Sequence, residues 1–413
     1  MKNVTKRDGR IVPFDRSKIV NAIRSAMERT SRIDEALANY ISERIAAIDH
    51  DCTVEEIQDI VEHYLMDSDR KDVAKEYIIY RAERSRIREM NSGIVKNVWD
   101  KISGKKIENA NANVDEATFG GRKNEASSAL QKALALDMNM SPDIAQAHKD
   151  GYIYEHDLDS YNVGMHNCLF IDFDHIFKNG FATRNGDVRP PRSFSTACQQ
   201  VAVAFQIQSQ SQYGGVASAH LDYDLAPFVA MSFERHFMDG LKYVEATDDH
   251  SDYTTLIIRL DNAQLKEEYP RAYAYAMDML EREGKQAAQG LYHNLNTLES
   301  RAGSQVPFTS INFGRDTSTE GRLVSRWMME ASLEGIGKHH TTSIFPISIF
   351  SLKKGVNFYP GDPNYDLKQL AIKSMSKRIY PNFAFGDWSE AHEDPNDIDT
   401  IFSTMGKCKL QLM

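Results

Sequence analysis

Cys168 stands at the start of a short apolar run and directly after a side-chain amide, Asn167. The run Leu169-Phe170-Ile171 is bounded by polar residues on both sides, which is typical of a short buried strand. A thiol at the mouth of such a strand is shielded from bulk solvent, and the neighbouring amide can bind a ligand. This arrangement favours thiol redox or radical chemistry over a structural disulfide. The alternative interpretation is that Cys168 is a small core residue.

The other cysteines indicate a reduced protein. The four cysteines of the chain are Cys52, Cys168, Cys198 and Cys408. Since no two of them form a C-x-x-C pair, we expect no zinc site within this chain and a cytoplasmic location. Cys198 recurs with Val201 and Phe205 at helical spacing, which predicts a packed thiol on a helix rather than a catalytic one.

A second group that could do chemistry is the cluster of cations near the N-terminus. It consists of Lys6, Arg7, Arg10, Arg16 and Lys18. Phosphate groups favour sites where fixed cations and unpaired backbone N–H groups act together. A solvated basic face is the alternative interpretation.

The elements that position these cations are predicted to be a hairpin and about four helices. Asp8-Gly9 is a two-residue turn signal, and Asp15 can cap the first helix. Thr53 and Glu56 have the spacing of a capping box. The last helix is expected to run into the basic stretch that ends near Arg88.

Residues 93–112 are polar and are predicted to link this unit to a larger one. A helix is expected over 125–138, and Tyr152 to Asp157 resembles a strand that leads into an acidic bend. Arg189 and Arg192 flank a Pro-Pro pair before a Gln-rich helix. They are candidate phosphate contacts, and a solvated connection is equally consistent with this loop.

Composition describes an ordinary globular protein. The chain has 413 residues, of which 41% are hydrophobic and 26% charged, enough for two or three domains. The net charge of −10 argues against direct nucleic-acid binding. No apolar run approaches the roughly 20 residues that span a bilayer, so no membrane helix is expected.

The N-terminal residues 1–92 resemble the ATP-cone, a regulatory module of many ribonucleotide reductases. The likeness rests on Val4-x-Lys6-Arg7-Asp8-Gly9 and on Phe14-Asp15-x-x-Lys18-Ile19-x-x-Ala22-Ile23. This resemblance implies that ATP or dATP binds here as an allosteric effector. The residues implied as its contacts are Lys6, Arg7, Lys18, Thr53, Arg81 and Arg84.

Residues 113–406 resemble the catalytic domain of the anaerobic, class III ribonucleoside-triphosphate reductases. The motifs that carry the likeness are Asn113-Val114-Asp115-Glu116, Phe119-Gly120-Gly121-Arg122, His156-Asp157, His166-Asn167-Cys168-Leu169, Ser195-Thr196-Ala197-Cys198-Gln199, Gln212-Tyr213-Gly214-Gly215, Gln305 to Gly314, Ile344 to Ser348 and Lys377 to Asn382. The resemblance implies an α/β fold, the N-terminal part of the family's ten-stranded α/β barrel. A glycyl radical in that family oxidises a finger-loop cysteine, whose thiyl abstracts the ribose 3′ hydrogen.

By the same resemblance, Cys168 and Asn167 match the pair that takes part in reducing the 2′ position. The Gln-rich helix resembles the region where subunits pair and bind specificity effectors, which implicates Arg189 and Arg192. Formate is the family's usual reductant, and a radical-SAM activase and self-association into a homo-oligomer are implied as well.

The likeness ends at Gly406. The family has its radical cysteine directly after a Met-Gly pair, whereas here Cys408 is displaced by one residue. We therefore expect 407–413 to be an unrelated tail, and the glycyl radical and zinc site to lie on a missing C-terminal reductase fragment. The chain is predicted to be the N-terminal portion of a reductase, inactive alone. A catalytically dead nucleotide-binding regulatory protein is the main alternative, and another glycyl-radical enzyme such as an acyl lyase is a third.

Overall fold

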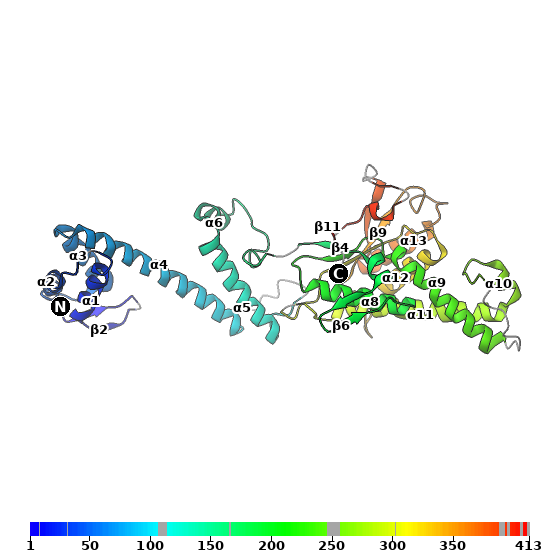
Figure 1. Ribbon diagram of the computed structural model, residues 1–413, viewed down its shortest axis with the longest axis horizontal. Coiled ribbons are helices and arrows are strands. Elements are labelled where there is room, and N and C mark those ends of the chain that lie inside the picture. The colour runs from blue at the N-terminus through cyan, green and yellow to red at the C-terminus, as the bar shows by residue number, and fades with distance from the viewer. Residues whose placement is uncertain are drawn as a thin grey trace. The chain divides into compact units, whose positions relative to one another are not determined.

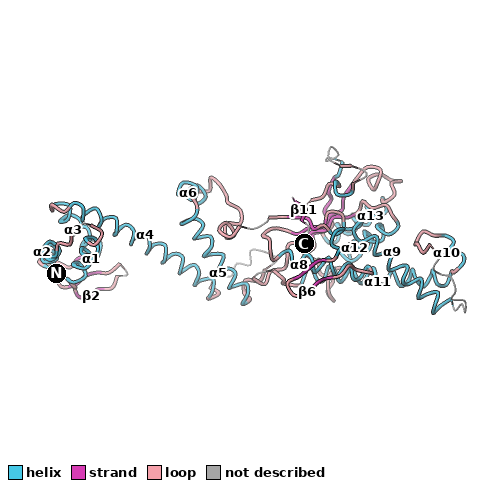
Figure 2. Tube along the Cα trace, viewed as in Figure 1, coloured by secondary structure: helices cyan, strands magenta, loops and turns pink. Residues whose placement is uncertain are grey.

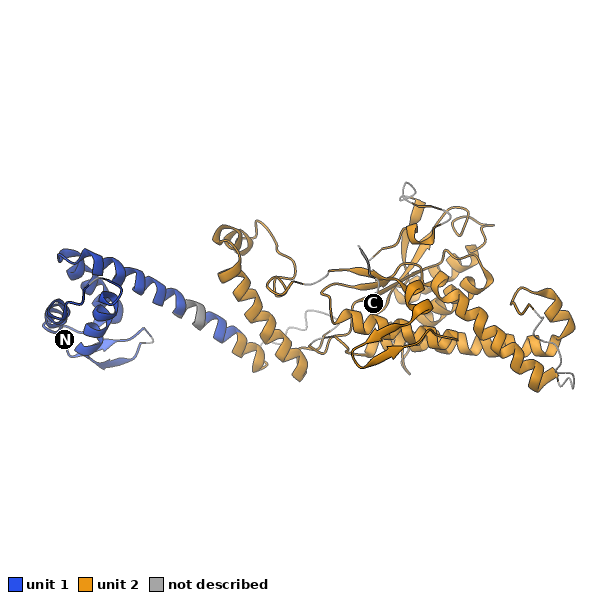
Figure 3. Ribbon diagram, in the orientation of Figure 1, with its two compact units in different colours: residues 1–97 blue, residues 98–413 orange. Residues whose placement is uncertain are grey.

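The computed structural model divides the chain into two compact units, Met1–Asn97 and Val98–Met413 (Figure 3). It describes all residues except 8, 31, 106–113, 165–166, 246–256, 302, 388–392, 395–396, 405–407 and 411–413, and, of residues 88–92 and 408–410, the backbone alone. The predicted turn residue Asp8, residues 106–112 of the predicted linker and the Met405-Gly406 pair therefore lie outside the described residues.

The first unit is a three-stranded sheet with helices. Its elements are β1 (Asn3–Thr5), β2 (Ile11–Pro13), α1 (Arg16–Met27), α2 (Glu35–Ala46), β3 (Cys52–Thr53), α3 (Val54–Asp67) and the first part of α4 (Lys71–Ile102). β1 pairs antiparallel with β2 and parallel with β3. The apolar face of α1, with Ile23 and Met27 fully buried, packs in one core with Val73 and Tyr77 of α4.

Local signals in the sequence account for most of these helix starts. The Asp15 side chain accepts a hydrogen bond from the Ser17 backbone N–H at the start of α1. Thr53 and Glu56 form both hydrogen bonds of a capping box at the start of α3. The hairpin and the four helices of the unit are thereby confirmed. α4 continues to Ile102 instead of ending near Arg88, so the first ten residues predicted as linker are helical.

The second unit is built on a parallel sheet (Figures 1 and 2). Its helices are α5 (Phe119–Leu134), α6 (Pro142–Lys149), α7 (Phe173–Asn179), α8 (Phe194–Ser209), α9 (Leu221–Gly240), α10 (Ala263–Glu268), α11 (Pro270–Thr297), α12 (Thr319–Glu334) and α13 (Tyr365–Arg378). Its strands are β4 (Leu169–Ile171), β5 (Phe181–Thr183), β6 (Gly186–Val188), β7 (Val216–Ser218), β8 (Thr309–Phe313), β9 (Ile347–Leu352), β10 (Asn382–Phe385) and β11 (Cys408–Leu410).

Six of these strands form one sheet in the order β10-β9-β8-β7-β4-β11, and every neighbouring pair is parallel. All five residues of β8 are buried, as expected for a parallel strand covered on both faces. The predicted α/β class is confirmed. Within the segment predicted as an unrelated tail, β11 pairs with β4 so that Cys408 lies opposite Leu169.

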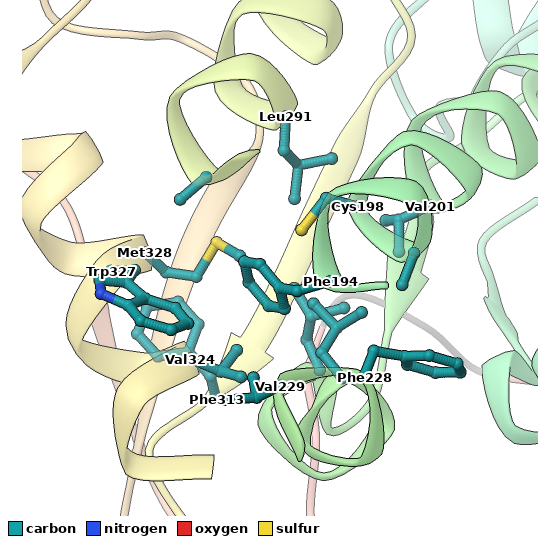
Figure 4. Close-up of a cluster of buried hydrophobic side chains, with 14 of the residues drawn as sticks. Phe194, Cys198, Val201, Phe228, Val229, Leu291, Phe313, Val324, Trp327 and Met328 are labelled. Carbon is teal, nitrogen blue, oxygen red and sulfur yellow. The ribbon is translucent and has the colours of Figure 1, made fainter. Parts of the chain in front are cut away.

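Helices α8, α9, α11 and α12 pack against one another and against the sheet. Their shared core, drawn in Figure 4, contains Phe194, Phe313 and Trp327. Burying each such side chain stabilises the fold by about 1.5–3 kcal/mol. Cys198 lies in this core with 2% of its surface exposed, and burial raises the pKa of its thiol. The predicted packed thiol is confirmed.

One predicted strand is wrong. Residues 152–157 form turns instead of a strand. Tyr152 and Tyr154 are 84% and 80% exposed, and the Tyr152 N–H bonds back to the Ala147 carbonyl at the end of α6. The alternation of aromatic and polar residues resembled a strand, but within the part of the chain that the structure describes no strand pairs with residues 152–157.

Candidate functional site

Cys168 lines a cavity of about 600 Å³ at the amino ends of β4, β7 and β8. The predicted strand after it is confirmed as β4, which continues the sheet through its pairing with β7. Cys168 itself is partly exposed, so its thiol is open to the cavity. The chain therefore presents this sulfur at a strand end rather than within the core.

Two hydrogen bonds fix the thiol. The Gly215 backbone N–H donates to Cys168 Sγ at 3.3 Å, and the thiol donates to Asn167 Oδ1 at 3.5 Å. The Gly214 N–H also donates to the Asn167 carbonyl, at 3.0 Å. A Cβ on Gly214 would lie 2.4 Å from Asn167 Oδ1, so only glycine allows this close approach. The predicted pair Asn167 and Cys168 is thus held by the Gly214-Gly215 turn.

Polar side chains gather on the same cavity. The Tyr213 hydroxyl donates to Asp159 Oδ1 at 3.2 Å, and Ser128 donates to the other oxygen of Asp159 at 2.7 Å. Burial and then the charge of Asp159 raise the pKa of Tyr213, which keeps its hydroxyl protonated. His156 Nδ1 lies against the Asp157 carboxylate at the cavity wall. Tyr213 and Asp159 can therefore hold hydroxyl groups of a bound ligand in fixed directions.

Arg301 is a cation of this cavity that the sequence did not single out. Its guanidinium lies over the rings of Tyr213 and Phe308, 5.6 and 5.3 Å from their centroids, and donates to the Gln212 and Tyr213 carbonyls. Burial lowers the pKa of Arg301. A single arginine between elements has no periodicity, so only the three-dimensional fold reveals its contact with Tyr213.

In the first unit, the structure brings two of the predicted nucleotide contacts together. Lys6 and Lys18 line one cavity of about 160 Å³, whose other walls include Phe14, Gln58 and Tyr77. Both lysines come from the edge of the hairpin and the start of α1, as the spacing of the cations predicted.

The predicted contacts Arg81 and Arg84 line a second hollow of about 380 Å³, which shares Gln58 and Tyr77 with the first. Arg81 is bound by the carboxylates of Glu55, Asp59 and Glu62 at 2.6–2.9 Å. Arg84 donates to the Tyr80 hydroxyl at 3.0 Å.

The remaining predicted residues are occupied elsewhere or exposed. Arg7 pairs with Glu55 and donates to Gln58 at 2.9 Å, and Thr53 caps α3. Arg189 and Arg192 are exposed on the loop before α8, where the Arg189 carbonyl accepts a hydrogen bond from Gln200 at 2.6 Å. Among the described residues, no helix is both long and apolar enough to cross a bilayer.

Comparisons with known proteins identify the families of both parts of the chain. Residues 110–413 match the family model of the anaerobic ribonucleoside-triphosphate reductases, and residues 2–86 match that of the ATP cone domain. The chain is 32% identical over 387 residues to the anaerobic ribonucleoside-triphosphate reductase of Haemophilus influenzae, covering 92% of this chain and 51% of that protein. The Escherichia coli enzyme is 32% identical over 388 residues, with the same coverage.

A solved structure of the Thermotoga maritima anaerobic ribonucleotide reductase in complex with dATP and CTP is 14% identical, with a TM-score of 0.47. That alignment covers 74% of this chain and 50% of the other. The chain spans about half the length of the curated relatives that it matches.

Proposed function

Because the chain belongs to the anaerobic ribonucleoside-triphosphate reductase family, we propose that it supplies the nucleotide-sensing part and one reducing thiol of such an enzyme. The observation that carries the proposal is the Cys168 thiol, held by Asn167 and Gly215 and open to a cavity of about 600 Å³. A cavity of this size lies within the range of about 300–1,000 Å³ that is typical of ligand sites.

Cys168 is proposed to take part in reducing the 2′ position of a ribonucleoside triphosphate. In this reduction the C2′–O bond breaks and the hydroxyl leaves as water, the Cys168 S–H gives its hydrogen to C2′, and formate, oxidised to carbon dioxide, restores the thiol. The direction of the S–H bond therefore decides whether transfer occurs. Asn167 Oδ1 and the Gly215 N–H hold that direction. Tyr213, Asp159 and Arg301 supply the polar groups that orient the ribose and its phosphates.

The remaining chemistry is proposed to come from partners. A C-terminal reductase polypeptide, activated by a radical-SAM enzyme, is expected to carry the glycyl radical and the zinc site, and that radical starts the reaction. Formate is the proposed reductant. Family membership supports these partners, self-association into a homo-oligomer, and a specificity-effector site near Arg189 and Arg192.

The first unit is proposed to bind ATP or dATP as an allosteric effector. Lys6 and Lys18 provide the cations for the phosphates, and the neighbouring hollow, which carries Arg81 and Arg84, gives room for the rest of the nucleotide. Arg7 and Thr53 are proposed contacts from the rim. Their present partners, Glu55 and Glu56, would have to release them.

Reconstitution under anaerobic conditions tests the catalytic proposal. The mixture contains this chain, a C-terminal reductase polypeptide, a radical-SAM activase, formate and a ribonucleoside triphosphate. We expect deoxyribonucleotide from the complete mixture and none from the chain alone. Absence of product, although electron paramagnetic resonance detects the radical on the partner, would instead support a nucleotide-binding protein without chemistry.

Calorimetric titration with dATP tests the effector site. Lys6→Ala and Lys18→Ala should each weaken binding about tenfold or more, because each removes a cation that faces the phosphates. Lys71→Ala, an exposed lysine at the start of α4, is the matched control and should bind as the unmodified chain does. Equal affinities for all four proteins would remove the assignment of the two lysines.

A further inference from the structure

A segment close to the C-terminus lies across the carboxyl ends of three neighbouring strands. We call residues 393–394 and 397–404 the strap. Its contacts come from β8 and from the loops after β7, β8 and β9. Ser403 donates to the Ala219 carbonyl at 2.6 Å, beyond the end of β7. The Thr404 N–H donates to Asn312 Oδ1 on β8 at 3.3 Å, and Asn312 donates back to the Thr404 carbonyl at 3.2 Å.

Glu393 forms the first charged anchor of the strap. Its carboxylate, 8% exposed, accepts from Arg315 after β8 at 3.2 and 3.3 Å and from Lys353 after β9 at 2.5 Å. It also accepts from the Phe402 backbone N–H at 2.9 Å, which closes the strap on itself. The backbone of Arg315 is fixed in turn, because the Arg315 backbone N–H donates to the buried Asp222 carboxylate at 2.8 Å. An ion pair this buried holds its partners in one geometry.

His220 forms the second charged anchor. Its ring lies 3.2 Å from Asp399 on the strap and 3.1 Å from Asp224 within α9, and its side chain is 8% exposed. Asp222 also contributes its charge, and the Tyr223 ring lies edge-on to the imidazole. Burial alone would lower the pKa of His220, but Asp224 and Asp399 outweigh it and raise the pKa to about 9. The imidazolium therefore bridges the two carboxylates at neutral pH.

The strap continues into β11, the strand that pairs with β4 directly after Cys168. We propose that Glu393 and His220 are positioning residues, which hold the strap on the carboxyl ends of β7, β8 and β9 and thereby keep β11 in register beside β4, the strand that directly follows Cys168. That the register of β11 matters for catalysis by Cys168 rests on the proposed function. The structural coupling between the strap and β11 does not rest on it.

Hydrogen–deuterium exchange of the full chain tests this coupling without any activity assay. Glu393→Gln and His220→Gln should each speed exchange about tenfold or more in peptides covering 397–404, since each removes a charge-assisted anchor. Exchange of the β11 amides, 408–410, should rise as well. Asp366→Asn, which removes an exposed ion pair with Arg322 in the same unit, is the matched control.

The pH dependence of exchange distinguishes the His220 anchor from the Glu393 anchor. Between pH 7 and pH 10 the unmodified chain should lose protection in the strap, measured relative to the base-catalysed intrinsic exchange rate, as His220 loses its proton. His220→Gln should lack this pH-dependent loss of protection. Core peptides of α8 report general unfolding, and Lys353→Gln, which removes one cation from Glu393, replaces Glu393→Gln if the latter does not fold. Unchanged exchange over 408–410 in the variants, or a rise shared equally by α8, would overturn the proposal.

Discussion

Replacing Gly214 by alanine should disturb the thiol site more than the same change one residue later. A Cβ on Gly214 would lie 2.4 Å from Asn167 Oδ1 and 2.7 Å from the Asn167 carbonyl carbon and oxygen. A Cβ on Gly215 would meet its nearest atom, the Phe308 carbonyl oxygen, at 3.5 Å, an ordinary contact. The two glycines are therefore a matched pair that differs in the space around Cβ.

The expected cost follows from this geometry. In Gly214→Ala the backbone of Asn167 itself must move, because two of the three close atoms belong to its main chain. Overpacking of this kind costs about 1–3 kcal/mol, and the lower entropy of the unfolded alanine chain offsets about 0.4–1 kcal/mol. The net loss of unfolding free energy is about 1–2 kcal/mol for Gly214→Ala, against no loss for Gly215→Ala.

Urea unfolding followed by tryptophan fluorescence measures this difference. The three tryptophans, Trp99, Trp327 and Trp388, all belong to the unit 98–413, so the signal reports the unit that holds the site. Alkylation of Cys168, followed by peptide mass spectrometry, should also change rate in Gly214→Ala because Asn167 shifts. Equal stability and equal alkylation of the two variants would refute the reasoning.

Three further predictions concern stability. Gly284→Ala should lower the free energy of unfolding by about 1–3 kcal/mol in the same fluorescence assay, because its Cβ would lie 2.4–2.5 Å from the Trp327 ring. Gly290→Ala, with open space around its Cβ, is the control and should not lower it. Arg81→Ala should destabilise the first unit by about 1–2 kcal/mol in thermal unfolding followed by circular dichroism, because it removes the cation that three carboxylates share and leaves Glu55 with Arg7 alone. An unchanged midpoint would contradict this. Burial alone would raise the pKa of Glu393, but Arg315 and Lys353 outweigh it and lower the pKa to about 2. The ionised Glu393 carboxylate should therefore contribute about 2–3 kcal/mol to the free energy of unfolding above pH 4.5, and this contribution should be lost as the pH falls toward 2. The stability gap between the unmodified chain and Glu393→Gln should close over that window, and a gap independent of pH would argue against the ion pair.

Features encoded within a few residues could be predicted from the sequence. The capping box of Thr53 and Glu56, the cap at Asp15 and the strand after Cys168 each depend on neighbours along the chain, and each is confirmed. The location of Lys6 and Lys18 at one cavity also followed from local signals, because a hairpin and the helix after it are close in space.

Features that depend on distant residues could not be predicted. The turn at Tyr152 was mistaken for a strand because alternation alone does not reveal whether a pairing partner exists. The contact between His220 and Asp399 joins residues 179 positions apart, and that between Arg301 and Tyr213 joins residues 88 apart. Neither pair has a spacing that a helix or strand period would reveal.

The most direct test of the account is the amount of deoxyribonucleotide formed by the reconstituted mixture when only Cys168 is changed. Cys168→Ser should abolish product, while Cys198→Ala, which alters a packed thiol outside the cavity, should retain it. Product formation at the unmodified rate by Cys168→Ser would contradict the assignment of Cys168 as the reducing thiol.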